Sequence, residues 1–309
     1  MKNLKKYAGI DIGGSFIKYG IVNETGEIIF SDKYPTDRKD PEAVLDRLTQ
    51  IILRLKADYG IEQVGISIPG VINRENRLIT SGAIDNLYLY DVSRILSEKT
   101  QTQILLTNDA NAIAYAEKWL GAGKDCDNFV CLPLGTGVGG SIVIDGKVIK
   151  GRVGAAGEFG MVLMGLGKTE PVGYESSSFY CGAIAGLCRI YNYKLGQKDF
   201  TKWERDIETI LASAENGQKE AIESFDEFYQ NVAVLLLNIR VSLDPEKILI
   251  GGGISENKTI MQGIQTAVEQ LVTRYTDMSA IGFPEIMSST LGNTAGMIGA
   301  VSQFVEGEK

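Results

Sequence analysis

The sequence predicts an α/β protein with two lobes and a central cleft. At 309 residues the chain exceeds the usual length of a single domain. Its beginning is typical of an antiparallel strand meander followed by β-α units, and a second meander begins near residue 129. In both meanders a strand enters a tight glycine turn and returns as a strand. We therefore expect two duplicated lobes that share little sequence identity.

The first meander leads into a helix. Residues 7–12 and 16–22 are mostly apolar and predict two strands around the turn Gly13-Gly14. A helix is predicted from Asp40-Pro41 to just before Gly60, because apolar residues recur at helical spacing and proline suits the first turn. We expect this helix to lie across the sheet.

Parallel strands follow the helix. Residues 64–68 predict a strand that ends at Pro69-Gly70, and residues 104–107 predict another. A helix over about 110–120 comes directly after the second strand. This alternation indicates parallel β-α units.

The second meander comprises predicted strands at 129–134, 141–144 and 147–149, with a glycine-rich turn at 135–140. The remaining chain is mainly helical. It contains one clear strand, at 247–250, which ends in three glycines.

The two lobes are expected to cover residues 1–117 and 118–293. A C-terminal helix at about 294–309 is expected to pack back on the first lobe. No low-complexity linker separates the lobes, which favours a hinge of helices over a flexible tether.

The composition excludes several classes of function. The formal charge is −8 without a basic cluster, which argues against nucleic acid as a partner. No apolar run is long enough to cross a bilayer, and residues 1–6 do not resemble a signal-peptide core, so we expect a cytoplasmic protein without a membrane partner. The four cysteines form no CxxC pair and are expected to be reduced and mostly packed. The chain has no histidine, so acid-base chemistry must fall to carboxylates, Lys or Tyr.

Three glycine turns at strand ends are candidate phosphate-binding loops. Successive glycines let backbone N–H groups approach phosphate oxygens, and ligands gather at strand ends in sheets of this kind. A tight hairpin turn explains any one of them about equally well, but three together favour a nucleotide site. The residues expected to contact the nucleotide are Gly13, Gly14, Ser15, Gly135, Thr136, Gly137, Gly139, Gly252 and Gly253.

Two other nucleotide-binding motifs fail on their context. Residues 135–140 have the spacing G-x-G-x-x-G, but a dinucleotide fingerprint needs a helix after it, and residues 141–144 predict a strand. Residues 165–169 resemble the end of a P-loop, yet its first required glycine would fall at Val162.

Two carboxylates lie beside these features. Asp11 precedes the first turn, where it could hold a magnesium ion through water near a transferred phosphate; the alternative is that it caps its own turn. Asp109 lies between a strand and a helix, so it is a candidate base for a sugar hydroxyl, with Asn108 holding a neighbouring hydroxyl. The dipeptide alone favours the alternative that Asn108 or Asp109 caps the helix.

Taken together, the motifs resemble the ROK family, whose name combines repressors, open reading frames and sugar kinases. The resemblance covers nearly the whole chain and rests on segments in family order: 11–15, 67–71, 108–112, 134–140, 251–253 and 293–300. It implies an actin-like ATPase (ribonuclease H-like) fold, with ATP and magnesium between the lobes. It also implies a homodimer and a sugar deep in the cleft, phosphorylated usually on its terminal hydroxymethyl oxygen.

The resemblance also implies roles for individual residues. Asp109 would be the general base, and Asn108 and Gly70 would contact the sugar. Glu158 and Glu175 would accept further sugar hydroxyls. Without the resemblance, a solvated loop charge explains either glutamate about as well.

The sequence departs from the family at its zinc motif. Many members carry a histidine directly after Gly-Glu-x-Gly and a cysteine cluster beyond it, which hold a structural zinc and orient the sugar. Here Met161 occupies the histidine position and residues 162–173 contain no cysteine, so we expect no zinc. Met161 offers packing in place of a hydrogen bond. The acceptor therefore stays open among glucose, an N-acetylated hexosamine, fructose and a β-glucoside.

Two other functions share this fold. A non-catalytic sugar-binding regulator would carry a DNA-binding segment before the first phosphate motif, where only ten residues precede Asp11. An actin-like ATPase would use the glycine turns without a sugar held by Asn108, Asp109 and Glu158. Sugar-dependent release of ADP would distinguish a kinase from both.

Overall fold

The computed structural model describes residues 4–306 and divides into two compact units. The first unit comprises Met1–Asp125, Gly146–Ala156 and Thr290–Lys309, and the second comprises Cys126–Asp145 and Gly157–Ser289. Each unit has a mixed sheet and an apolar core of its own. In this division residues 118–125 and 146–156 belong with the first unit, whereas the sequence analysis assigns them to the second lobe.

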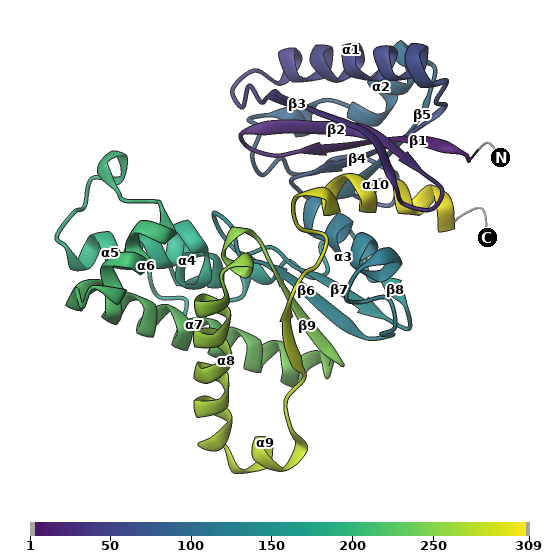
Figure 1. Cartoon of the computed structure of the whole chain (residues 1–309). Helices are drawn as coiled ribbons and strands as arrows, with labels where there is room; N and C mark the ends of the chain where they lie inside the picture. The colour runs from purple at the N-terminus through teal and green to yellow at the C-terminus, as the bar shows by residue number, and fades with distance from the viewer. Residues whose placement is uncertain (1–3, 307–309) are drawn as a thin grey trace. The chain divides into compact units, whose positions relative to one another are not determined.

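The first sheet has the strand order β3-β2-β1-β4-β5 (Figure 1). The predicted antiparallel meander is present as β1 (Lys6–Ile12), β2 (Phe16–Asn23) and β3 (Ile28–Pro35). On the other side of β1, β4 (Gln63–Ile68) and β5 (Gln103–Asn108) are parallel to it, as predicted. The carboxyl ends of three parallel strands therefore meet at one edge of this sheet.

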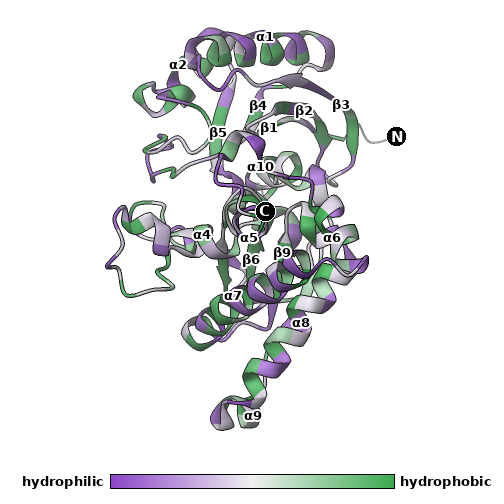
Figure 2. Ribbon diagram, turned by 90° about the vertical axis from the view of Figure 1, so that its left-hand side faces the viewer, coloured by the Kyte–Doolittle hydropathy of each residue, from purple (hydrophilic) through white to green (hydrophobic). Residues whose placement is uncertain are grey.

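The long helix α1 (Pro41–Tyr59) forms where the sequence predicts it. Asp40 caps its first turn by accepting a 2.9 Å hydrogen bond from the Ala43 amide, and Gly60 ends it with a φ of 67°. Hydrophobic and hydrophilic residues alternate along α1 (Figure 2), and the hydrophobic ones join the core of the first sheet.

The first sheet is covered on both faces. α1 and α2 (Val92–Thr100) lie on one face, and α10 (Ala295–Glu306) lies on the other, beside α3 (Asp109–Leu120) (Figure 1). The expected C-terminal helix is therefore present on the first unit as far as residue 306. Its last expected positions, 307–309, lie outside the described residues.

The second sheet has the order β10-β9-β6-β7-β8. Its strands are β6 (Phe129–Pro133), β7 (Ser141–Ile144), β8 (Lys147–Val148), β9 (Lys247–Gly251) and β10 (Glu285–Ser288). The central strand β6 pairs with β7 in the antiparallel sense and with β9 in the parallel sense. Because β1 has the same kinds of neighbours in the first sheet, the predicted duplication is confirmed at the level of strand order.

The helices of the second unit come after β8 in the sequence, and several of them contribute to the core of this unit. They are α4 (Ser177–Cys181), α5 (Arg189–Lys194), α6 (Ile207–Glu215), α7 (Lys219–Leu243), α8 (Lys258–Thr273) and α9 (Thr276–Ile281). The long helix α7 contributes Phe225, Phe228 and Leu236 to this core, where they join Ile248 and Ile250 of β9. Among the described residues, no helix combines the length and hydropathy that a bilayer crossing requires.

Glu117, on α3, binds two segments of the first unit: the one that follows α3 and the one that leads into α10. Its side chain is fully buried and accepts hydrogen bonds from the amides of Ala122 (2.8 Å), Thr290 (2.7 Å) and Leu291 (3.0 Å). A buried carboxylate needs such donors. They hold the segment after α3 on the first unit, which accounts for part of the difference from the expected boundary at 117.

All four cysteines are buried and none forms a disulfide, as predicted. Burial raises the pKa of the Cys181 and Cys188 thiols to about 12. These two side chains therefore behave as small apolar groups in the core of the second unit.

Candidate active site

Asp11 lies at the end of β1 and is held by three neighbours within the first unit. Its Oδ1 accepts a 2.8 Å hydrogen bond from Ser67 Oγ on β4, and Lys18 Nζ on β2 lies 3.9 Å from its Oδ2. Gly296 in the first turn of α10 packs so closely that a Cβ there would lie 2.3 Å from Oδ1. Burial raises the pKa of Asp11, although the hydrogen bond from Ser67 and the charge of Lys18 act in the opposite direction. Its hydrogen-bond partner is thus Ser67 and not the turn that follows it.

The first glycine turn is covered by the segment after β3. Thr36 Oγ1 donates a 2.8 Å hydrogen bond to the Gly13 carbonyl, and the Thr36 amide donates a 3.0 Å bond to that of Ser15. The exposed guanidinium of Arg38 lies 3.8 Å from the position that a Cβ of Gly14 would occupy. A cation therefore stands beside the predicted phosphate turn. The sequence analysis did not select Arg38, and its only local signal is a positive charge shortly after a strand.

Asn108 ends β5 and caps α3, and its role as a sugar ligand stays a prediction. Its Oδ1 accepts a 3.0 Å hydrogen bond from the Asn111 amide. Its Nδ2 donates 3.0 Å bonds to the Gly70 carbonyl and to Asp109 Oδ1. Gly70 has a φ of 120°, and a Cβ there would lie 1.9 Å from the Thr80 carbonyl oxygen, so this position requires glycine. Asn108 thus joins the turn after β4 to the carboxylate at the start of α3.

Asp109 is exposed at the first position of α3. Its Oδ1 accepts the bond from Asn108 and a 2.9 Å bond from the Ala110 amide. The amino end of a helix favours a negative charge. The predicted base is therefore an oriented carboxylate near the carboxyl ends of β4 and β5.

The second unit brings its two glycine loops together. The Leu134 amide donates a 2.9 Å hydrogen bond to the carbonyl of Gly251. Gly252 has a φ of 85° and packs so closely that a Cβ there would lie 2.4 Å from the Leu134 carbonyl oxygen. A Cβ added at Gly135 or Gly253 would have no neighbour within 4 Å, so neither position is crowded. The Gly135 amide itself donates a 2.9 Å hydrogen bond to the Gly137 carbonyl within the loop.

The middle of this loop packs on its own unit. A Cβ at Gly137 would lie 2.9 Å from Ser178 Oγ. The carbonyl of Thr136 accepts a 3.0 Å hydrogen bond from Ala185, and the Gly139 amide donates a 2.9 Å bond to the last residue of β6. Ser178, which the sequence analysis did not select, therefore helps to shape the loop.

Glu158 lies beside the end of the same loop. The ring of Phe159 and the carbonyl of Gly157 pack against Gly140, where a Cβ would lie 2.3 Å and 2.4 Å from them. The Glu158 side chain is half-buried, and burial raises its pKa. It makes no hydrogen bond or ion pair with the residues that the structure describes. A partly desolvated carboxylate without a partner is typical of a ligand-binding position.

Glu175 has a different environment. Its side chain is buried and accepts hydrogen bonds from the amides of Gly167 (2.6 Å), Lys168 (2.8 Å) and Thr169 (2.5 Å). The side-chain and backbone hydrogen bonds of Thr169, followed by those of Gly167 and Lys168, lower its pKa. The carboxylate thus organises the loop 163–176, and its role as a sugar ligand stays a prediction.

The segment that holds zinc in many family members carries no cluster of metal ligands here, among the described residues. Within residues 4–306, no three Cys, Asp or Glu side chains gather as a metal site. Met161 is 68% exposed, and its packing on a sugar stays a prediction.

Two sheets with matching strand order and glycine turns at their strand ends define a protein with the actin-like ATPase fold. Solved structures with this fold cover almost all of both chains. A ROK family protein from Streptococcus pneumoniae in complex with sucrose is 29% identical, with a TM-score of 0.85, and the match covers 98% of this chain and 99% of that one. A ROK family glucokinase from Streptomyces griseus in complex with glucose and AMPPNP is 25% identical, with a TM-score of 0.78 and coverage of 97% and 99%.

The sequence comparisons agree with the fold. The model of the ROK family matches residues 7–306. A β-glucoside kinase from Listeria innocua is 31% identical over 98% of each chain. An N-acetyl-D-glucosamine kinase from Haemophilus influenzae is 29% identical over 97% of this chain and 99% of its own length. The chain belongs to the ROK family.

Proposed function

We propose that this protein is an ATP-dependent kinase that phosphorylates a hydroxyl of a small sugar. The observation that carries the proposal is Asp109, an exposed carboxylate fixed by Asn108 and the Ala110 amide at the start of α3. Relatives named as sugar kinases support it, as does the related glucokinase structure with glucose and AMPPNP.

In the proposed reaction Asp109 accepts the proton of the sugar hydroxyl while the hydroxyl oxygen attacks the terminal phosphorus of ATP. The bond from that phosphorus to the bridging oxygen breaks, and ADP leaves with the electron pair. Asn108 orients Asp109 through its Nδ2. Gly70 and Glu158 would contact the sugar. Glu158 suits this role because its half-buried carboxylate makes no hydrogen bond or ion pair with the described residues.

The glycine turns of each unit would bind the phosphates of ATP through backbone amides. The amides of Gly13, Gly135 and Gly139 already donate within their own loops, so the contacts would come from other amides of these turns. Asp11 fits a magnesium site because it offers a hard, largely buried carboxylate beside the first turn. It would hold the ion through water. When bound, magnesium would neutralise charge on the phosphates.

Three further properties belong to the proposal. We infer that the protein holds no structural zinc, because Glu175 organises the loop that zinc would otherwise hold. We infer a cytoplasmic location, which suits four cysteines that form no disulfide. We also infer a homodimer, as the family resemblance suggests, and sedimentation analysis will test it.

ADP release should be measured with MgATP and a panel of sugars, for the wild type and for Asp109→Asn. We expect at least one active acceptor, and turnover at least about a hundredfold lower in the variant, since the positioned base is lost. Asp58→Asn is the matched control, because Asp58 is an exposed residue of α1 whose ion pair is with Arg54 at 3.7 Å.

Circular dichroism should show that both variants fold. Near-normal turnover of Asp109→Asn would reject the assignment of the base. ADP release that needs no sugar would favour an ATPase, and sugar binding without ADP release would favour a regulator.

A further inference from the structure

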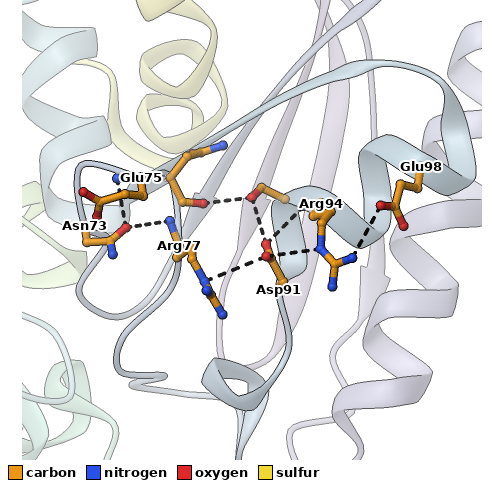
Figure 3. Close-up of polar contacts among 8 residues, drawn as sticks. Asn73, Glu75, Arg77, Asp91, Arg94 and Glu98 are labelled. Carbon is orange, nitrogen blue, oxygen red and sulfur yellow. Dashed lines mark hydrogen bonds and ion pairs between the residues drawn. The ribbon is translucent and has the colours of Figure 1, made fainter.

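Residues 78–90 of the first unit form a surface loop whose two ends are joined. Arg77 Nε lies 3.8 Å from Asp91 Oδ2 (Figure 3). Ser93 Oγ donates a 2.9 Å hydrogen bond to the carbonyl of Asn76. Asn73 Oδ1 shapes the entry to the loop by accepting a 2.9 Å bond from the Arg77 amide (Figure 3). Loops with joined ends are compact and hold their shape.

The loop is fixed to the rest of the first unit as well. The Asn76 side chain donates a 2.9 Å hydrogen bond to Ile104 and accepts a 2.8 Å bond from the Leu106 amide, both on β5. On the opposite side Arg38 Nε donates a 3.0 Å bond to the carbonyl of Ala83, and the Asp85 amide donates a 2.8 Å bond to the carbonyl of Arg38. The loop is thus tied to the segment that covers the first glycine turn.

Two buried side chains fix the orientation of the loop, so that their neighbours face the solvent. Ile84 and Leu87 are buried in the core of the first unit, with 1% and 0% exposure. The residues between and beside them, Asp85, Asn86 and Tyr88, are exposed. The backbone is held by a 3.0 Å hydrogen bond from the amide of residue 89 to the Asn86 carbonyl. These polar and aromatic groups are therefore presented on a rigid support.

The outward side chains line a cavity of about 590 Å³. Its lining residues are Ile79, Thr80, Ser81, Asp85, Asn86 and Tyr88. Small-molecule sites typically measure ~300–1,000 Å³ and combine apolar walls with a few polar groups. Here Tyr88 and Ile79 are 45% and 43% exposed and offer the apolar wall, while a carboxylate, an amide and two hydroxyls offer hydrogen bonds. A pyranose ring needs this combination, because it has apolar C–H faces and a rim of hydroxyls.

The cavity adjoins the proposed site of phosphoryl transfer without including it. Thr80 lines the cavity, its Oγ1 accepts a 3.0 Å hydrogen bond from the Val71 amide, and its carbonyl packs on Gly70. The Gly70 carbonyl in turn accepts the bond from Asn108, which holds Asp109. Neither Asn108 nor Asp109 lines the cavity.

We propose that this cavity binds the second pyranose ring of a disaccharide acceptor, while the first ring lies at Asn108 and Asp109. The inference rests on the proposed kinase function and specifies its substrate class. Tyr88 packs on one face of the second ring, and Asp85 and Asn86 accept or donate hydrogen bonds at its hydroxyls.

The test compares kcat/KM for matched monosaccharides and disaccharides. The pairs are glucose with cellobiose, N-acetylglucosamine with N,N′-diacetylchitobiose, and fructose with sucrose. For the accepted pair, we expect Tyr88→Ala to lower kcat/KM for the disaccharide about fivefold, the size of effect expected when one aromatic contact is lost. The value for the monosaccharide should change by less than about twofold, since the first ring does not touch Tyr88 in this arrangement.

Asp85→Asn provides a second variant, which should weaken the disaccharide alone and thereby exclude a general loss of folding. Tyr275→Ala is the control, because Tyr275 is 51% exposed and belongs to the second unit, and it should affect neither substrate. The proposal is overturned if no disaccharide is phosphorylated while a monosaccharide is, or if Tyr88→Ala affects both members of a pair equally. If no sugar of either kind gives ADP, the proposed function itself fails.

Discussion

At the scale of single residues, Asp11 has an environment that suits a bound cation better than an empty site. Burial raises its pKa above the value of an unfolded chain. The folded state therefore holds this proton more tightly than the unfolded state. The contribution of Asp11 to stability is full at low pH and is lost as the pH rises through the unfolded and folded pKa values. At neutral pH, above the unfolded pKa, Asp11 therefore contributes less to the stability of the ligand-free protein than at low pH.

Asp11→Asn should accordingly leave the melting temperature of the ligand-free protein at pH 7 unchanged or raise it. The same change should lower turnover with MgATP at least about a hundredfold, because charge stabilisation near the phosphates is lost. Thermal melts and ADP release measure the two effects separately.

Asp32→Asn is a suitable comparison for this variant. The backbone amide of Lys33 and the hydroxyl of Tyr19 lower the pKa of Asp32, so its ionised form stabilises the fold. Its substitution should not raise the melting temperature, and turnover should stay normal. A clear fall in the melting temperature of Asp11→Asn at pH 7 would contradict our interpretation of Asp11.

At the scale of elements, the loop 163–176 depends on the carboxylate of Glu175. Its pKa is lowered, so the stabilisation is present above the ordinary value of 4.5 and is lost as the pH falls through the folded value. In Glu175→Gln, one acceptor oxygen becomes an amide donor that faces backbone N–H groups. At pH 7 we expect faster hydrogen exchange at the amides of Gly167, Lys168 and Thr169, measured by mass spectrometry.

Glu170→Gln, at an exposed position of the same loop, should leave this exchange unchanged. A metal chelator should also leave the wild-type exchange unchanged, since we infer no zinc in the loop. Faster exchange after chelation, or stoichiometric zinc in elemental analysis, would show that the inference about zinc is wrong.

The regular elements were largely predictable from the sequence, because their signals are local. α1 shows helical spacing between a capping Asp40 and Gly60, and the strands before Gly13 and Gly70 end at visible turns. Shorter elements were not predicted individually: α2 and β10 have only 9 and 4 residues, too few for a clear period.

The candidate site was predictable only in part. Asp109 and Asn108 could be selected because they stand where a strand meets a helix. Whether Asn108 caps the helix, binds a sugar or does both could not be decided, since its bond to Gly70 joins two strands that are distant in sequence. The partners of Glu175 and the lining around Tyr88 come from irregular loops, which show no periodicity from which contacts could be inferred.

At the scale of the whole molecule, the state of the cysteines can be tested directly. All four are buried, and the thiols of Cys181 and Cys188 have a pKa of about 12, so they stay protonated and unreactive near neutral pH. We expect little reaction of the native protein with a disulfide reagent such as DTNB at pH 7. All four should react after denaturation, and rapid labelling of the folded protein would contradict the buried arrangement.

The order of synthesis affects when the first sheet can be completed. Because α10 packs on β1 and β4, that part of the sheet stays uncovered until α10 has left the ribosome. The second unit ends at Ser289, so all its residues are translated earlier. The nascent chain can therefore complete its middle portion first. The strands β1 and β2, made earlier, can bury Tyr7 and Val22 against α10 only after that helix has been made.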